Sequence, residues 1–93
     1  MLQFLHSRHV LREWPVDPGF PELDNRDAAN PGKGERVATW RATLPESAVL
    51  GNVFTHVQVV DGAGHLLVAE ECSTPVHKEA GKQLLVYVNE HIR

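Results

Sequence analysis

Polar and apolar residues alternate between Arg36 and Leu44, and this alternation predicts a β-strand with one buried face. The inward set is apolar and consists of Ala38, Trp40, Ala42 and Leu44. The set that we expect to face solvent consists of Val37, Thr39, Arg41 and Thr43. Pro45 ends the strand because proline lacks the N–H group that a sheet requires.

A β-hairpin is predicted in the next part of the chain. Residues 53–60 alternate, with Val53, Val57 and Val59 on one face and Phe54, His56, Gln58 and Val60 on the other. The segment Asp61-Gly62-Ala63-Gly64 is typical of a tight turn. We expect the return strand to span residues 65–72, with Leu66 and Val68 facing inward.

The C-terminal segment predicts a helix over residues 75–92. Thr74 is a suitable capping residue, and Pro75 suits the first helical position. One face of this helix is apolar and consists of Ala80, Leu84, Leu85, Val88 and Ile92. Gly81 weakens the helix, and the run from Leu84 to Val88 also fits a strand, so both alternatives stay open.

The N-terminal third is less regular. Residues 1–14 fit a short helix or an edge strand, and Pro15 favours an end to a helix near Trp14. Residues 15–35 are rich in proline, glycine and acidic side chains and show no sustained period, so we expect a long acidic loop.

Together these elements predict one α+β domain over residues 1–93. Its sheet is antiparallel, has three or four strands and lies within residues 36–72, with the C-terminal helix packed on one face. The N-terminal segment adds a second helix or the fourth strand.

Composition narrows the classes of function. The net charge is −3, which disfavours a general nucleic-acid binder because such proteins neutralise phosphates. No stretch approaches the roughly 20 apolar residues of a membrane span. The single cysteine excludes an intrachain disulfide, and we read no signal peptide at the N-terminus, so we expect a cytoplasmic protein.

The residues offer two candidate chemistries, a metal site and a nucleophilic thiol. His6 and His9 would be neighbours on a helix, with His91 or a carboxylate completing a metal site, but a zinc site needs three or four ligands at recognisable spacing. Cys72 has Glu70 and Glu71 beside it, which disfavour the thiolate that a nucleophile requires. We therefore predict no catalytic residue, no metal and no cofactor.

A pair of strands followed by a helix near His77-Lys78-Glu79-Ala80 resembles the end of a double-stranded-RNA-binding domain. In that family lysines at the helix N-terminus contact phosphates. The resemblance implies a nucleic-acid-binding alternative, although only Lys78 and Lys82 are basic here.

We predict a small non-enzymatic module that binds another protein or regulates one. The expected binding surface is the polar face of the sheet, with Arg41 as the principal contact and Phe54 as its apolar neighbour. His56 and Gln58 complete this predicted protein-binding set. A nucleic-acid-binding module and a histidine-based metal-binding protein are the two alternatives.

Overall fold

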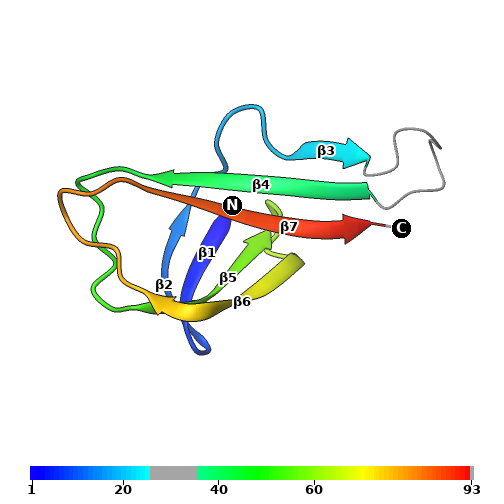
Figure 1. The fold of residues 1–93 in the computed structure, drawn as a ribbon. Helices are drawn as coiled ribbons and strands as arrows, with labels where there is room; N and C mark the ends of the chain where they lie inside the picture. Colours follow the sequence, from blue (N-terminus) through cyan, green and yellow to red (C-terminus); the bar gives the residue numbers. More distant parts are fainter. Residues whose placement is uncertain (26–35, 93) are drawn as a thin grey trace.

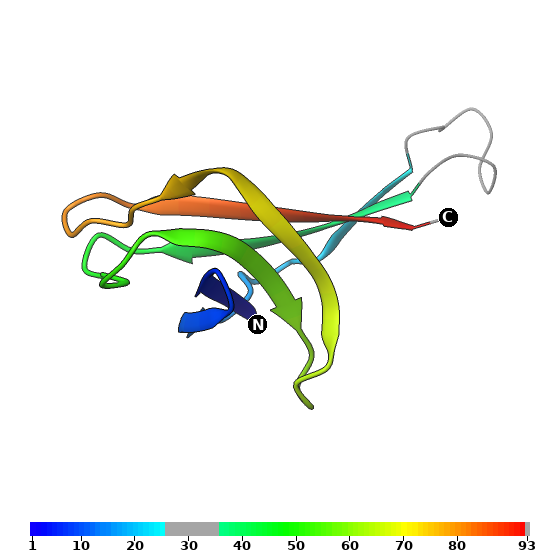
Figure 2. The same ribbon diagram turned by 90° about the horizontal axis from the view of Figure 1, so that it is seen from below.

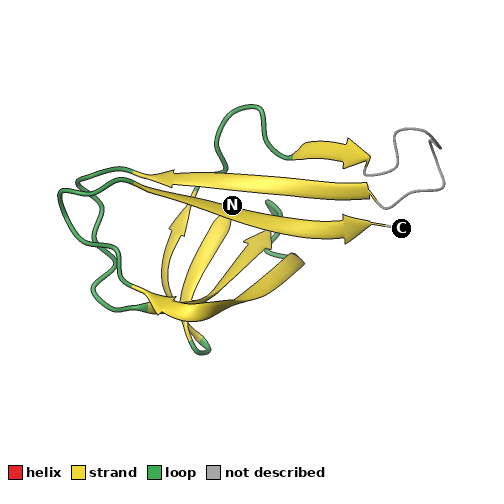
Figure 3. Ribbon diagram, in the orientation of Figure 1, coloured by secondary structure: helices red, strands yellow, loops and turns green. Residues whose placement is uncertain are grey.

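The computed structural model describes residues 1–25 and 36–92, and all of its regular elements are strands (Figures 1 and 3). In chain order they are β1 (Leu2–His6), β2 (His9–Trp14), β3 (Glu22–Asn25), β4 (Arg36–Leu44), β5 (Phe54–Val60), β6 (Leu66–Val76) and β7 (Leu84–Ile92). The described part of the chain contains no helix, so the α+β prediction is wrong and the fold is all-β.

The strands form two antiparallel sheets instead of one. The first has four strands in the order β2-β1-β5-β6, and the second has three in the order β3-β4-β7. Figure 2 shows β4 and β7 running straight past the strongly curved β5 and β6. β6 and β7 are each the outer strand of their sheet, and they are joined by the loop of residues 77–83.

The core lies between the inner faces of these sheets. The predicted inward face of β4 is confirmed, because Ala38, Trp40, Ala42 and Leu44 are all buried. Val37, which was expected to face solvent, is buried as well, so that part of the prediction is wrong. Val88 of β7 lies opposite Trp40 and is fully buried as well. The remaining members of the core cluster are Leu2, Phe4, Ala48, Leu50, Phe54, Val57 and Val59.

The C-terminal helix prediction is wrong and the strand alternative holds, because residues 84–92 pair with β4 along their whole length. Leu84, Val86 and Val88 face inward along β7, while Leu85 and Tyr87 face outward. Gly81 takes a φ of +90°, which a helix cannot accommodate. Thr74 and Pro75, which were expected to begin the helix, are extended at the end of β6. β6 is an edge strand, and proline is tolerated in edge strands.

The predicted hairpin is confirmed, with a longer return strand than expected. Leu66, which was predicted to face inward, is 59% exposed, so that part of the prediction is wrong. The Gly64 N–H donates to the Asp61 carbonyl at 3.0 Å, and the Asp61 carboxylate accepts the N–H groups of Ala63 and His65 at 2.9 and 2.8 Å. Three backbone donors on one carboxylate and carbonyl hold this turn closed.

The N-terminal segment is a hairpin, so the helix predicted there is wrong and the strand alternative holds. β2 forms one edge of the four-stranded sheet, while β1 is an inner strand paired with β5. The expected loop of residues 15–35 contains β3, which pairs with β4. Residues 26–35 of that loop lie outside the described residues.

Two end loops, residues 45–53 and 77–83, are fastened together by a buried lysine. Lys78 is only 1% exposed, and its Nζ donates to the carbonyls of Ala48 and Glu79 at 2.8 and 2.6 Å. The Gly81 N–H adds a bond of 2.8 Å to the Glu46 carbonyl. This link fixes where β7 begins relative to the rest of the domain.

Candidate functional site

The structure divides the predicted binding set between the two sheets. Arg41 lies on β4 of the three-stranded sheet, whereas Phe54, His56 and Gln58 lie on β5 of the four-stranded sheet. The sheet face on which the prediction placed all four therefore does not exist as one surface. Whether any of these residues binds a partner stays a prediction.

Arg41 is held by contacts within the chain. Its Nε lies 2.7 Å from Oδ2 of Asp17, and its guanidinium carbon lies 4.4 Å from the centre of the Phe20 ring. The hydrogen bond with Asp17, followed by one with Tyr87, raises the pKa of Arg41. The same carboxylate accepts the Thr43 N–H at 3.1 Å and the Thr43 hydroxyl. Arg41 thus anchors the segment before β3 onto β4.

Phe54 faces the core, so the prediction that it faces solvent is wrong. It is 2% exposed, and its ring contacts that of Phe4 edge-on at 5.1 Å. Phe54 and Val57 lie three residues apart and are both buried, so the alternation of β5 shifts by one residue where its pairing with β6 is irregular. His56 and Gln58 remain half-buried, with Gln58 donating to the side chain of Gln3.

The histidines of the metal-binding alternative are not assembled. His6 and His9 face each other across the β1–β2 hairpin, whereas His91 lies on β7 of the other sheet. Within residues 1–25 and 36–92, no group of three or more His, Cys, Asp or Glu side chains is placed to hold a metal ion. No helix in this described part is long and apolar enough to cross a membrane.

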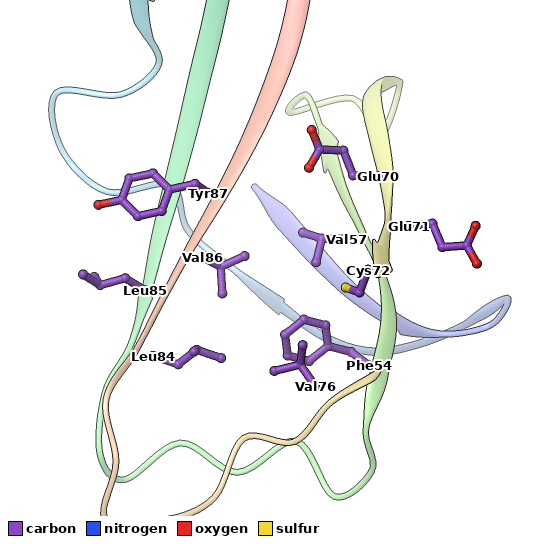
Figure 4. A pocket seen from close by; sticks show the side chains of 10 residues that line it. All are labelled: Phe54, Val57, Glu70, Glu71, Cys72, Val76, Leu84, Leu85, Val86 and Tyr87. Carbon is purple, nitrogen blue, oxygen red and sulfur yellow. The ribbon is translucent and has the colours of Figure 1, made fainter. Parts of the chain in front are cut away.

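An apolar hollow separates β6 from β7, and we call it the seam (Figure 4). Its volume is about 220 Å³. Its lining comes from β5, β6 and β7 and consists of Phe54, Val57, Glu70, Glu71, Cys72, Val76, Leu84, Leu85, Val86 and Tyr87. The hollow is smaller than the roughly 300 Å³ at which small-molecule sites usually begin, so it suits one or two side chains of a larger partner.

The side chains in the seam follow from strand alternation. Leu84 and Val86 point from β7 toward Phe54 and Val76, as Figure 4 shows. On the opposite side of β7, Leu85 is 48% and Tyr87 51% exposed. β7 therefore offers apolar surface on both faces, at an edge with which no other described strand pairs.

The free edge of β7 can be located residue by residue. The Asn89 N–H points away from β4, because it donates to Oε1 of Glu70 on β6 at 3.1 Å. In an antiparallel pair every second residue has the same backbone direction, so the peptide groups of Leu85 and Tyr87 also point into the seam. Within residues 1–25 and 36–92, no strand pairs with β7 on this side.

Electrostatics in the seam are acidic. The thiol of Cys72 is half-buried, and its burial, followed by the charges of Glu70 and Glu71, raises its pKa. The thiol is therefore protonated at neutral pH and is a poor nucleophile. A nearby histidine could act as a base for a thiol, but Nδ1 of His56 lies 2.8 Å from the hydroxyl of Thr55 and is engaged there.

Sequence reasoning missed Glu70, Leu85 and Tyr87. For Leu85 and Tyr87, the signal was the unbroken apolar run from Leu84 to Val88. A strand with apolar residues at every position buries one face in the core and leaves a second apolar face exposed. The signal for Glu70 was its inward position, two residues from both Val68 and Cys72. Comparison of the chain with protein-family models, with curated proteins and with solved structures finds no match.

The resemblance to a double-stranded-RNA-binding domain loses its structural basis. The helix on which it depends is absent, since residues 84–92 form β7. Lys78, the residue expected to contact phosphate, is buried and bonded to two carbonyls.

Proposed function

We propose that this protein is a non-enzymatic interaction module that binds an extended segment of another protein in the seam. One observation carries the proposal: two edge strands, β6 and β7, face each other across an apolar hollow without being paired. An extended segment that adds to a sheet edge gains main-chain hydrogen bonds, and pockets for its alternate side chains give selectivity.

The edge of β7 supports this mode of binding. The N–H groups of Leu85 and Tyr87 point into the seam, where they would meet the carbonyls of an added strand. Side chains of that strand would alternate between the hollow, beside Leu84 and Val86, and the outer face, beside Tyr87. Proteins normally protect exposed edges, and a long apolar edge left open favours pairing with another chain.

The rest of the lining also favours binding. Its lining is apolar apart from two carboxylates, a tyrosine and a protonated thiol. We also propose a cytoplasmic location, because a chain with one cysteine forms no intrachain disulfide.

The test selects binders from a displayed library of random nine-residue peptides, using the whole chain as bait. Leu85→Pro removes one N–H from the free edge, and proline is tolerated where the N–H does not serve the sheet. Leu85→Ser removes the same apolar side chain but keeps the N–H, so it is the matched control. We expect the selected peptides to lose binding to L85P and to keep most of it with L85S.

Two results would overturn the proposal. One is a library that yields no enriched peptide. The other is a set of enriched peptides that bind L85P as well as they bind the unmodified chain, which would place the site elsewhere. Thermal unfolding of both variants shows that each is folded before binding is measured.

A further inference from the structure

We infer that the segment bound in the seam carries a lysine or arginine that pairs with Glu70, displacing this carboxylate from the edge of β7. The inference rests on the proposed function and adds the chemistry of the partner to it. It is carried by the position of Glu70, which lies between the two edge strands and bridges them through Asn89.

Glu70 occupies the place that a strand would take. Its Oε1 accepts the Asn89 N–H at 3.1 Å, which is the bond that a carbonyl of an added strand would accept. The side chain is half-buried on the seam side of β6, together with Val68 and Cys72. A charged side chain turned inward at an edge strand protects that edge from indiscriminate pairing. Glu70 therefore competes with any strand that adds along the full length of β7.

Displacement leaves a half-buried carboxylate in need of a new partner. Removing a hydrogen-bond donor from a buried charged group is costly unless another donor replaces it. Glu71 follows on the same strand and also lines the hollow, whose lining contains two carboxylates and no basic side chain, so the seam is acidic. A cation on the incoming segment satisfies Glu70 and is favoured by these carboxylates, whereas a carboxylate there is repelled.

The partner chemistry follows from the two ends of the seam. Near the loop of residues 77–83 the hollow is apolar, with Leu84 and Val86 on one side and Val76 on the other. Farther along β7, at Asn89, the seam is acidic. The segment that fits has apolar side chains at its inward positions, followed by a basic side chain where it reaches Glu70. A second copy of this chain fits poorly, because it brings the same carboxylates and a net charge of −3.

The experiment compares three nine-residue peptides, the length of β7. All alternate valine with serine, and they differ only in their central residue, which is lysine, valine or glutamate. In full register with β7 this fifth residue lies opposite Val88, next to Asn89 and Glu70, in either strand direction. Titration into the isotopically labelled chain, followed by backbone amide resonances, gives the affinity and identifies the amides that shift.

We expect the peptide with the central lysine to bind about tenfold tighter than the one with the central valine, as one charge-assisted hydrogen bond implies. The peptide with the central glutamate should bind most weakly, and the shifts should centre on Leu85, Tyr87 and Asn89. The advantage of lysine should shrink as salt is added. Glu70→Gln should abolish that advantage, since the amide still accepts the Asn89 N–H but carries no charge.

Glu13→Gln is the matched control, because it makes the same change of charge on β2, at the far edge of the four-stranded sheet. It should keep the lysine preference. Equal affinity for the three peptides, with shifts in the seam, would overturn the inference and leave the proposed function standing. Failure of all three to shift any seam amide would count against both, and dimerisation of the chain through β7 would overturn the inference. The peptide series on the unmodified chain decides even if Glu70→Gln does not fold.

Discussion

Replacing Lys78 by methionine removes an ammonium group from one of the most buried positions of the chain and keeps most of the side-chain volume. The side chain is 1% exposed, and its Nζ donates to the carbonyls of Ala48 and Glu79 at 2.8 and 2.6 Å. The substitution leaves both carbonyls without this donor, so the two end loops keep only the bond from the Gly81 N–H to the Glu46 carbonyl.

Two opposing free energies set the expected size of the effect. A hydrogen bond to a charged group contributes about 1.5–3 kcal/mol, so the loss of two such bonds is substantial. Burying a cation in the first place is costly, and the uncharged methionine avoids that cost. We expect a net loss of about 2 kcal/mol in the free energy of unfolding, since the carbonyls lose their donor and gain no solvent access. For a domain of this size, that loss lowers the melting temperature by about 10 °C.

The assay is urea unfolding followed by tryptophan fluorescence, since Trp40 is buried in the core and reports its exposure. Lys82→Met is the matched control: it makes the same substitution in the same loop at an exposed position, and should change stability by less than about 0.5 kcal/mol. If K78M is as stable as K82M, the two hydrogen bonds do no more than offset the burial of the charge, and our account of the link is refuted.

Three further predictions concern the core, the anchor and the thiol. Trp40→Ala should cost about 3–5 kcal/mol in unfolding free energy, and an unchanged melting temperature would contradict its place in the core. Asp17→Asn should cost about 1 kcal/mol at pH 7 because it weakens the pairing with Arg41. Burial raises the pKa of Asp17, but the hydrogen bonds from Thr43 and Arg41 outweigh burial and lower it. The ionised Asp17 therefore stabilises the folded chain above the ordinary carboxyl pKa, and this stabilisation is lost as the pH falls through the lowered pKa. Urea titrations of both proteins should converge as the pH falls below about 4, and a gap that persists at pH 2 would exclude the linkage. Alkylation of Cys72 at pH 8 should be slower in the folded chain than in urea, since burial and then its acidic neighbours raise its pKa; equal rates would show that the thiol is not shielded.

The sequence predicts a strand well where one face is apolar and the other polar. Trp40 and its neighbours on β4 are correctly placed because the alternation there has a single interpretation. The turn at Asp61 is equally clear, since its glycines and its carboxylate specify a closed loop.

The wrong predictions have physical causes that a short stretch of sequence does not contain. An apolar run such as Leu84–Val88 fits a helix and a strand equally, and pairing with β4 decides between them. Phe54 faces the core because of an irregularity in pairing with β6, which alternation alone cannot reveal. The seam depends on two strands that end in different sheets, so its position was not accessible from either strand by itself.

The order of strands also constrains how the chain reaches this structure. The chain enters the four-stranded sheet with β1 and β2, leaves it for β3 and β4, returns for β5 and β6, and leaves again for β7. Completion of either sheet therefore requires closing long loops, as in the pairing of Leu2 with Val59 and of Arg36 with Ile92. Topologies dominated by such distant pairings fold in milliseconds to seconds, even when their hairpins form within about 10 µs. Since β7 covers Trp40 only after the chain has crossed between the sheets for the last time, we expect the change in tryptophan fluorescence to report the final step of folding.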